Sequence, residues 1–199
     1  MTRDKIIEAT IENFAEYGYQ GTSMRKIAEK VGIKPASIYY FFPNKQELFI
    51  HVVRCILRHH FANIKAAYEH YESGNINTLF SELFKIIVSH HTQNEKETKA
   101  YIKMVNSPIP DIKKEVREHF DEYDDWLVDH LTQVIHLSYP DLDHTEIKAI
   151  IDYFIFIGNG LFWGIVIYDQ ETIDKNLQQA THLMNQFLSQ TIGSEKDGS

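Results

Sequence analysis

Apolar side chains recur at helical spacing along most of the chain, and no segment shows the alternation of a β-strand. The pattern predicts helices over residues 2–17, 24–31, 36–41, 44–71, 76–91, 94–105, 111–138, 144–168 and 172–192. Proline and glycine separate them, as at residues 107–110, where two prolines prevent a helix from continuing. The sequence therefore predicts an all-α protein.

Two of the short helices are joined by a tight turn. The first has a continuous apolar face made of Met24, Ile27, Ala28 and Val31. Gly32 ends it, because glycine takes the left-handed conformation without steric cost. Pro35 suits the first position of the second helix, and Pro43 ends that helix. This arrangement predicts a helix-turn-helix over residues 24–43.

The next helix has a clear start. Asn44 is a good N-cap, and Glu47 three residues later completes a predicted capping box. The apolar pattern then runs without proline or glycine to Tyr71. We expect this long helix to be a strut that joins the helix-turn-helix to the rest of the chain.

The second helix of a helix-turn-helix enters the major groove, and residues at its start reach base edges. Here Ala36 and Ser37 are small enough to allow a close approach. The hydroxyl groups of two tyrosines and the lysines on either side suit phosphate oxygens. The predicted DNA-contacting residues are Thr22, Arg25, Lys34, Ala36, Ser37, Tyr39, Tyr40 and Lys45.

Residues 6–49 resemble the DNA-binding domain of the TetR family of transcriptional regulators. The matching segments are Ile7–Ala9, Phe14–Gly18, Gly21–Thr22, Met24–Ala28, Gly32–Ile33, Ser37–Tyr40, Phe42 and Asn44–Leu48. The resemblance implies a homodimer formed through the last two helices and a palindromic operator. It also implies a C-terminal domain that holds an effector lowering the affinity for DNA.

The charge is divided unevenly along the chain. The net charge is −8, but residues 1–60 carry 9 Lys or Arg against 6 Asp or Glu. The first part is thus basic, and the remainder would be repelled by DNA. The single cysteine, Cys55, excludes an internal disulfide, and the N-terminus lacks the apolar core of a signal peptide. We expect a cytoplasmic protein.

We predict a DNA-binding head over residues 1–60, an effector-binding and dimerisation body over 61–192, and a disordered tail over 193–199. Residues 153–168 carry no charge. This stretch is short for a membrane span, so we expect no membrane partner and a second copy that covers its outer side. The alternative is a monomer with this helix at its centre. The predicted dimer residues are Phe156, Gly160, Gly164, Ile167, Leu177, Met184 and Leu188.

Aromatic side chains are frequent in the predicted body. Large flat side chains with a few polar tips suit an apolar or aromatic ligand, although each of them could also be simple core. The predicted effector-binding residues are Phe61, Tyr68, Phe84, Tyr101, Met104, Phe120, Tyr123, Trp126, Phe154, Asn159 and Trp163.

The sequence contains none of the common motifs of catalytic, metal-binding or phosphate-binding sites. The chain has 11 histidines, but none stands in a metal-binding spacing such as HExxH, and no CxxC, GxSxG or phosphate-binding loop is present. We expect no cofactor, no metal and no enzymatic activity. The leading hypothesis is a ligand-responsive repressor that binds a palindromic operator as a homodimer. The alternative is an all-helical ligand carrier whose basic head contacts a protein partner.

Overall fold

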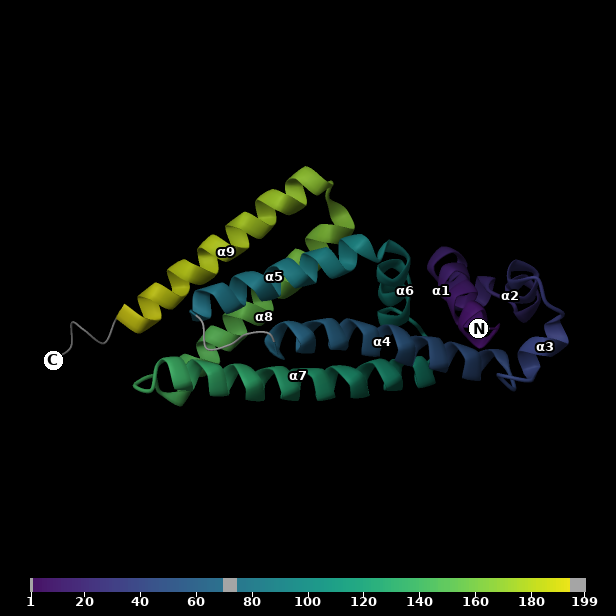
Figure 1. Cartoon of the computed structure of the whole chain (residues 1–199), viewed down its shortest axis with the longest axis horizontal. Helices are drawn as coiled ribbons and strands as arrows, with labels where there is room; N and C mark the ends of the chain where they lie inside the picture. Colours follow the sequence, from purple (N-terminus) through teal and green to yellow (C-terminus); the bar gives the residue numbers. More distant parts are fainter. Residues whose placement is uncertain (1, 70–74, 194–199) are drawn as a thin grey trace. The chain divides into compact units, whose positions relative to one another are not determined.

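The computed structural model describes residues 2–69 and 75–193, and every regular element in this part of the chain is an α-helix (Figure 1). The predicted end of the strut at residue 71, the break at residues 73–74 and most of the predicted tail lie outside the described residues. The helices are α1 Thr2–Gly21, α2 Met24–Val31, α3 Pro35–Tyr39, α4 Lys45–Glu69, α5 Ile76–Gln93, α6 Glu95–Val105, α7 Pro110–Ser138, α8 His144–Ile167 and α9 Gln170–Gly193. The predicted all-α fold is confirmed.

The chain forms two compact units. Unit 1 contains Met1–Phe61 and Asn94–Asp121, and unit 2 contains Ala62–Gln93 and Glu122–Ser199. Helices α4 and α7 each contribute their first part to unit 1 and their second part to unit 2.

The core of unit 1 consists of the apolar faces that the sequence pattern picks out. Its most deeply buried members include Ile6, Phe14, Ile27, Ile38 and Leu48, all at most 1% exposed. They come from α1, α2, α3 and α4, so the short helices are held by tertiary packing rather than by their own length.

Helix α1 is interrupted close to its end. Gly18 has φ 67° and ψ −175°, a backbone region that only glycine adopts readily. The predicted end of the first helix at Tyr17 coincides with this kink. The chain then makes one more helical turn to Gly21, which redirects the side chains beyond Gly18.

Helix α6 and the first part of α7 belong to unit 1, although the sequence predicts them as part of the body. Helix α6 packs along α1. Polar contacts hold both additions to the unit: Lys96 of α6 pairs with Glu12 of α1, and the Arg54 Nε of α4 donates to the Glu115 carboxylate of α7 at 2.7 Å. The compact unit that contains the helix-turn-helix is therefore larger than the predicted head.

Unit 2 is built on the mutual packing of α5, α8 and α9, with the second parts of α4 and α7 beside them. The rings of Phe80 and Phe84 each lie 5.0 Å from that of Phe154, between α5 and α8. A capping box fixes the start of α8: the Asp143 carboxylate accepts the backbone N–H of Glu146 at 2.9 Å, and the Glu146 carboxylate accepts that of Asp143 at 2.8 Å.

Candidate nucleic-acid interface and ligand-binding surfaces

The turn between α2 and α3 is fixed by local hydrogen bonds. The Ser23 hydroxyl caps α2 by accepting the Lys26 N–H at 3.2 Å. Gly32 takes the left-handed conformation, with φ 76°, and its N–H donates to the Glu29 carbonyl at 3.2 Å. The next N–H, that of Ile33, donates to the Ala28 carbonyl at 3.0 Å. The predicted stop of α2 at Gly32 is confirmed, and it sets the direction in which α3 leaves.

Helix α3 is held at one position and exposed at the others. Ile38 is completely buried and fastens the helix to the core of unit 1. Lys34, Ala36 and Ser37 are exposed at the start of the helix, where Pro35 occupies the first helical turn. The face opposite Ile38 is thus free to approach a ligand as large as a duplex.

Two tyrosines at the end of α3 remain in solvent. Tyr39 is 51% exposed and Tyr40 is 86% exposed, and the ring centres of Tyr40 and Phe41 lie 5.2 Å apart in an edge-to-face arrangement. A large aromatic side chain this exposed contributes little to the core. Its hydroxyl group is available to donate a hydrogen bond to a phosphate oxygen.

Thr22 and Arg25 differ from the other predicted DNA contacts. Thr22 is 1% exposed, and its hydroxyl donates to the Gly18 carbonyl at 2.8 Å, so it braces the turn before α2 instead of facing solvent. Arg25 is exposed and pairs with Glu29 across one helical turn, with the Arg25 Nε 3.0 Å from the carboxylate. A pair this exposed is weak, so Arg25 can exchange Glu29 for a phosphate.

Lys45 stands at the first position of α4. The Asn44 side chain caps this helix by accepting the Glu47 N–H at 2.8 Å, as predicted. The Lys45 ammonium lies 4.2 Å from the centre of the Tyr19 ring and 5.8 Å from that of Phe49. Partial burial against these rings lowers the pKa of Lys45 from its ordinary value. Sequence reasoning missed Tyr19, although its place directly after the kinked glycine was a signal.

The predicted effector-binding residues do not form one group. Phe61, Tyr101, Met104 and Phe120 lie in unit 1, and the other seven lie in unit 2. In unit 1, the rings of Tyr101 and Phe120 are 6.2 Å apart, and Met104 is fully buried.

In unit 2, one aromatic cluster is only partly buried. The Tyr68 ring lies 5.7 Å from Trp126, and the Tyr68 hydroxyl donates to the His130 carbonyl at 3.0 Å. The Lys65 ammonium lies 5.3 Å from the centre of the Trp126 ring. Nearby in sequence, burial raises the pKa of Tyr123 well above its ordinary value, so this phenol stays neutral. Phe84 and Phe154, in contrast, stack within the core.

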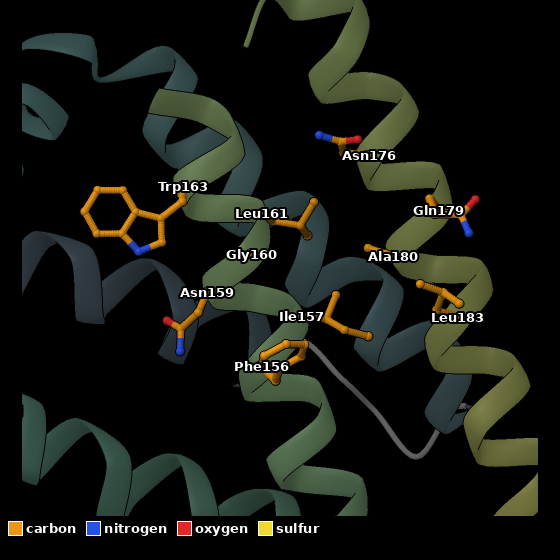
Figure 2. Close-up of a pocket in the computed structure, with 10 residues that line it drawn as sticks. All are labelled: Phe156, Ile157, Asn159, Gly160, Leu161, Trp163, Asn176, Gln179, Ala180 and Leu183. Atoms are coloured by element: carbon orange, nitrogen blue, oxygen red, sulfur yellow. The ribbon is translucent and has the colours of Figure 1, made fainter. Parts of the chain in front are cut away.

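A groove of about 460 Å³ runs between α8 and α9 (Figure 2). Two of the predicted effector residues, Asn159 and Trp163, line it together with Phe156 and Gly160, which were predicted to contact a second copy. Asn159 and Trp163 are exposed, because their positions on α8 face outward rather than into the core. The residues that line this groove do not include Tyr68 or Trp126. The remaining lining residues are Ile157, Leu161, Asn176, Gln179, Ala180 and Leu183.

The outer side of α8 is strongly apolar. Phe156, Trp163 and Ile167 are 76%, 46% and 67% exposed, and they follow one another at helical spacing. Among the described residues, α8 is the one helix long and apolar enough to cross a bilayer, and its inner side packs into unit 2. The prediction that the chain itself covers only one side of this helix is confirmed.

Three of the predicted dimer residues turn inward. Met184 and Leu188 are at most 1% exposed and belong to the core of unit 2, because their spacing places them on the side of α9 that faces α5 and α8. Gly164 is also buried, and a Cβ atom there would lie 3.4 Å from the Asn176 side chain of α9. Gly160 faces open space, and Leu177 is half-buried. Gly160 and Gly164 therefore do not lie together on the exposed side of α8.

Histidines of α4 and α5 make ordinary polar contacts. His59 contacts Glu97 at 3.0 Å, and Asn63 contacts His90 at 2.9 Å. Nowhere in the described ranges do three His, Cys, Asp or Glu side chains gather in a way that could hold a metal ion.

Comparison with known proteins agrees with this geometry. The family model of bacterial regulatory proteins, tetR family, matches residues 6–52. The regulator RutR of Escherichia coli K12 is 36% identical over 66 residues, and this match covers 33% of the chain and 31% of RutR. The chain thus aligns with about a third of the length of this relative.

Two further matches extend over nearly the whole chain. The negative regulator IcaR of the biofilm operon icaADBC from Staphylococcus epidermidis is 29% identical over 94% of this chain and 98% of IcaR. The transcriptional regulator FadR from Bacillus subtilis, solved in complex with stearoyl-CoA, shares the fold with a TM-score of 0.66 and 16% identity, over 95% of this chain and 97% of FadR. Residues 6–52 therefore form a DNA-binding domain of the TetR type, followed by a helical body whose fold these regulators share.

Proposed function

We propose that this chain is a transcriptional repressor that binds a palindromic operator as a homodimer and is released by a small apolar or aromatic effector. The observation that carries the proposal is helix α3. A single buried residue, Ile38, fastens it, and the side chains at its start and end are exposed. A helix of five residues that leaves two tyrosines in solvent has little role in folding, and it has the form of a recognition helix.

Charge supports DNA as the partner. Residues 1–60 carry a net positive charge within a chain whose net charge is −8. Lys34 and Lys45 lie at either end of the segment that contains α3. Positive groups on both sides of a recognition helix suit the two phosphate backbones that border a major groove.

The groove between α8 and α9 supports the homodimer. Its apolar side chains, with Phe156 and Trp163 the most prominent, are left uncovered by the chain itself. A second copy related by two-fold symmetry covers the same surface in both subunits. Such a dimer presents two α3 helices, which read half-sites about 34–36 Å apart on one side of the duplex.

Repression is the favoured direction of regulation, because IcaR, which aligns with nearly the whole chain, is named as a negative regulator. Release by an effector rests on the partly buried cluster of Tyr68 and Trp126 and on the fold shared with FadR. Helix α4 runs without interruption from Lys45 to Glu69, and so belongs to both units. A ligand that binds one conformation of this helix better than another shifts the population that fits the operator.

The DNA-binding part is tested by selecting 30-bp duplexes from a random library with the purified chain. We expect enrichment of inverted repeats whose half-site centres are about 10 bp apart. A plot of the logarithm of the binding constant against the logarithm of the salt concentration should be linear. Its slope should be about −0.9 for each phosphate that the protein neutralises. No enrichment, together with binding that salt does not change, would exclude a sequence-specific DNA-binding protein.

The effector part is tested with the variant Trp163→Phe, which leaves Trp126 as the only tryptophan. Compounds that bind near Tyr68 should change the fluorescence of Trp126. They should also lower the affinity for the selected duplex at least roughly tenfold, the range of ordinary allosteric coupling. The search should include long-chain acyl-CoA esters, the class of the ligand in FadR. Compounds that bind tightly but leave DNA affinity unchanged would favour the ligand-carrier hypothesis.

A further inference from the structure

The tyrosines on either side of the kink in α1 each lie beneath a lysine. Tyr17 precedes Gly18 and has the Lys26 ammonium 4.6 Å from its ring centre. Tyr19 follows Gly18 and has the Lys45 ammonium 4.2 Å from its ring centre. Because the Gly18 conformation belongs to glycine alone, the kink fixes the directions in which the two rings point.

The two lysines differ in what else holds them. The Lys26 ammonium also donates a hydrogen bond to the Gly21 carbonyl at 3.3 Å, so it is used within the turn before α2. The Lys45 ammonium has aromatic neighbours: the Tyr19 ring and, further away, the Phe49 ring. A ring face attracts a cation without taking up its N–H donors, so Lys45 keeps its capacity to bind an anion.

The Tyr19 ring is itself held in place. It packs edge-on against Phe49, with ring centres 4.7 Å apart, and Phe49 packs in the same way against Phe14 at 5.1 Å. Phe14 and Phe49 are fully buried in the core of unit 1. Tyr19 is therefore anchored to the core through Phe49 and Phe14. The flexible Lys45 side chain that rests on Tyr19 is restricted before DNA binds.

We propose that Tyr19 is a positioning residue for DNA binding: its ring holds the Lys45 ammonium in the place from which it contacts a backbone phosphate. The proposal rests on the proposed function. Restricting the Lys45 side chain in advance strengthens DNA binding, because less entropy is lost when the phosphate contact forms. Tyr19 acts through Lys45 and needs no DNA contact of its own.

The experiment measures binding to the 30-bp duplex that the wild-type chain enriches from a random library, over a series of salt concentrations. Tyr19→Leu removes the ring but keeps an apolar side chain against Phe49. We expect about a 5- to 30-fold loss of affinity for a dimer, because two lysine side chains must then be ordered on binding, and a shallower salt dependence. Tyr19→Phe keeps the ring and should bind within about twofold of the wild type.

The matched control is Tyr17→Leu, which removes the equivalent ring beneath Lys26 and should leave DNA affinity within about twofold, because Lys26 remains bound to Gly21. A double-mutant cycle with Lys45→Ala separates positioning from stability. In the Lys45→Ala background, Tyr19→Leu should cause no further loss. Tyr19→Met repeats the cycle if circular dichroism shows that Tyr19→Leu is unfolded.

Additive losses in the cycle, or an equal loss for Tyr17→Leu, would overturn the role of Tyr19. Either result would leave the proposed function intact, because both results can be obtained only if the wild-type chain binds DNA. Failure of the wild type to bind any duplex would instead refute the proposed function itself.

Discussion

Replacing Ala36 by glutamate is expected to abolish DNA binding. Ala36 is exposed on α3, one residue after Pro35, so the longer side chain meets no core residue and the fold should remain intact. In a complex, each of the two carboxylates would face the phosphate-lined groove, and like charges brought together at an interface cost several kcal/mol. We expect a loss of at least roughly a thousandfold in affinity, measured by fluorescence anisotropy with the selected duplex.

The matched control is Ala62→Glu, the same substitution at an exposed position in the second part of α4. It adds the same charge to the chain and should change affinity only slightly, because its distance from α3 along the chain removes it from the predicted interface. If the Ala36 and Ala62 variants lose affinity equally, net charge and not the position of α3 explains the loss, and α3 is not the recognition helix.

Replacing Phe156 by glutamate is expected to break the homodimer. Phe156 is 76% exposed in the single chain and lines the groove between α8 and α9. Burial of a phenylalanine side chain is worth about 1.5–3 kcal/mol, and both subunits would lose it and gain a carboxylate in an apolar surface. We expect the dimer dissociation constant to rise at least roughly a thousandfold, measured by analytical ultracentrifugation.

Leu137→Glu provides the control for this second experiment. Leu137 is 81% exposed near the end of α7 and is as apolar as Phe156, but it does not line the groove. Its variant should remain a dimer and bind the duplex normally, whereas the Phe156 variant should occupy single half-sites weakly. A Phe156→Glu variant that stays dimeric would place the subunit interface elsewhere on the chain.

The helix-turn-helix was well predicted because several local rules agree there. Gly32 ends α2 in the left-handed conformation, and Asn44 caps α4, each for a reason that is visible in the sequence. Ile38 is the buried member of α3, as the apolar pattern indicates. Short-range geometry settles these features, so one sequence is enough to predict them.

Helices α8 and α9 show why the remainder was harder. Residues 153–168 are apolar on every side, so periodicity does not reveal which side faces the core. Trp163 was predicted with the inward aromatic residues of the body, and the structure places it on the exposed side of α8, in the groove beside α9. On α9, Met184 and Leu188 are apolar enough for an interface and are nevertheless core. Aromatic content likewise does not separate a stacked pair such as Phe84 and Phe154 from a ligand cluster.

The composition of unit 1 has a consequence for protein engineering. The chain leaves this unit after Phe61, returns at Asn94 and leaves again after Asp121, so its DNA-binding part is not one continuous piece of sequence. A chimera made with a single crossover after residue 61 would give α1 a foreign partner and remove the pair between Lys96 and Glu12. A new sensor is better introduced by exchanging residues 62–93 and 122–199 together. Three junctions then preserve every native contact within unit 1.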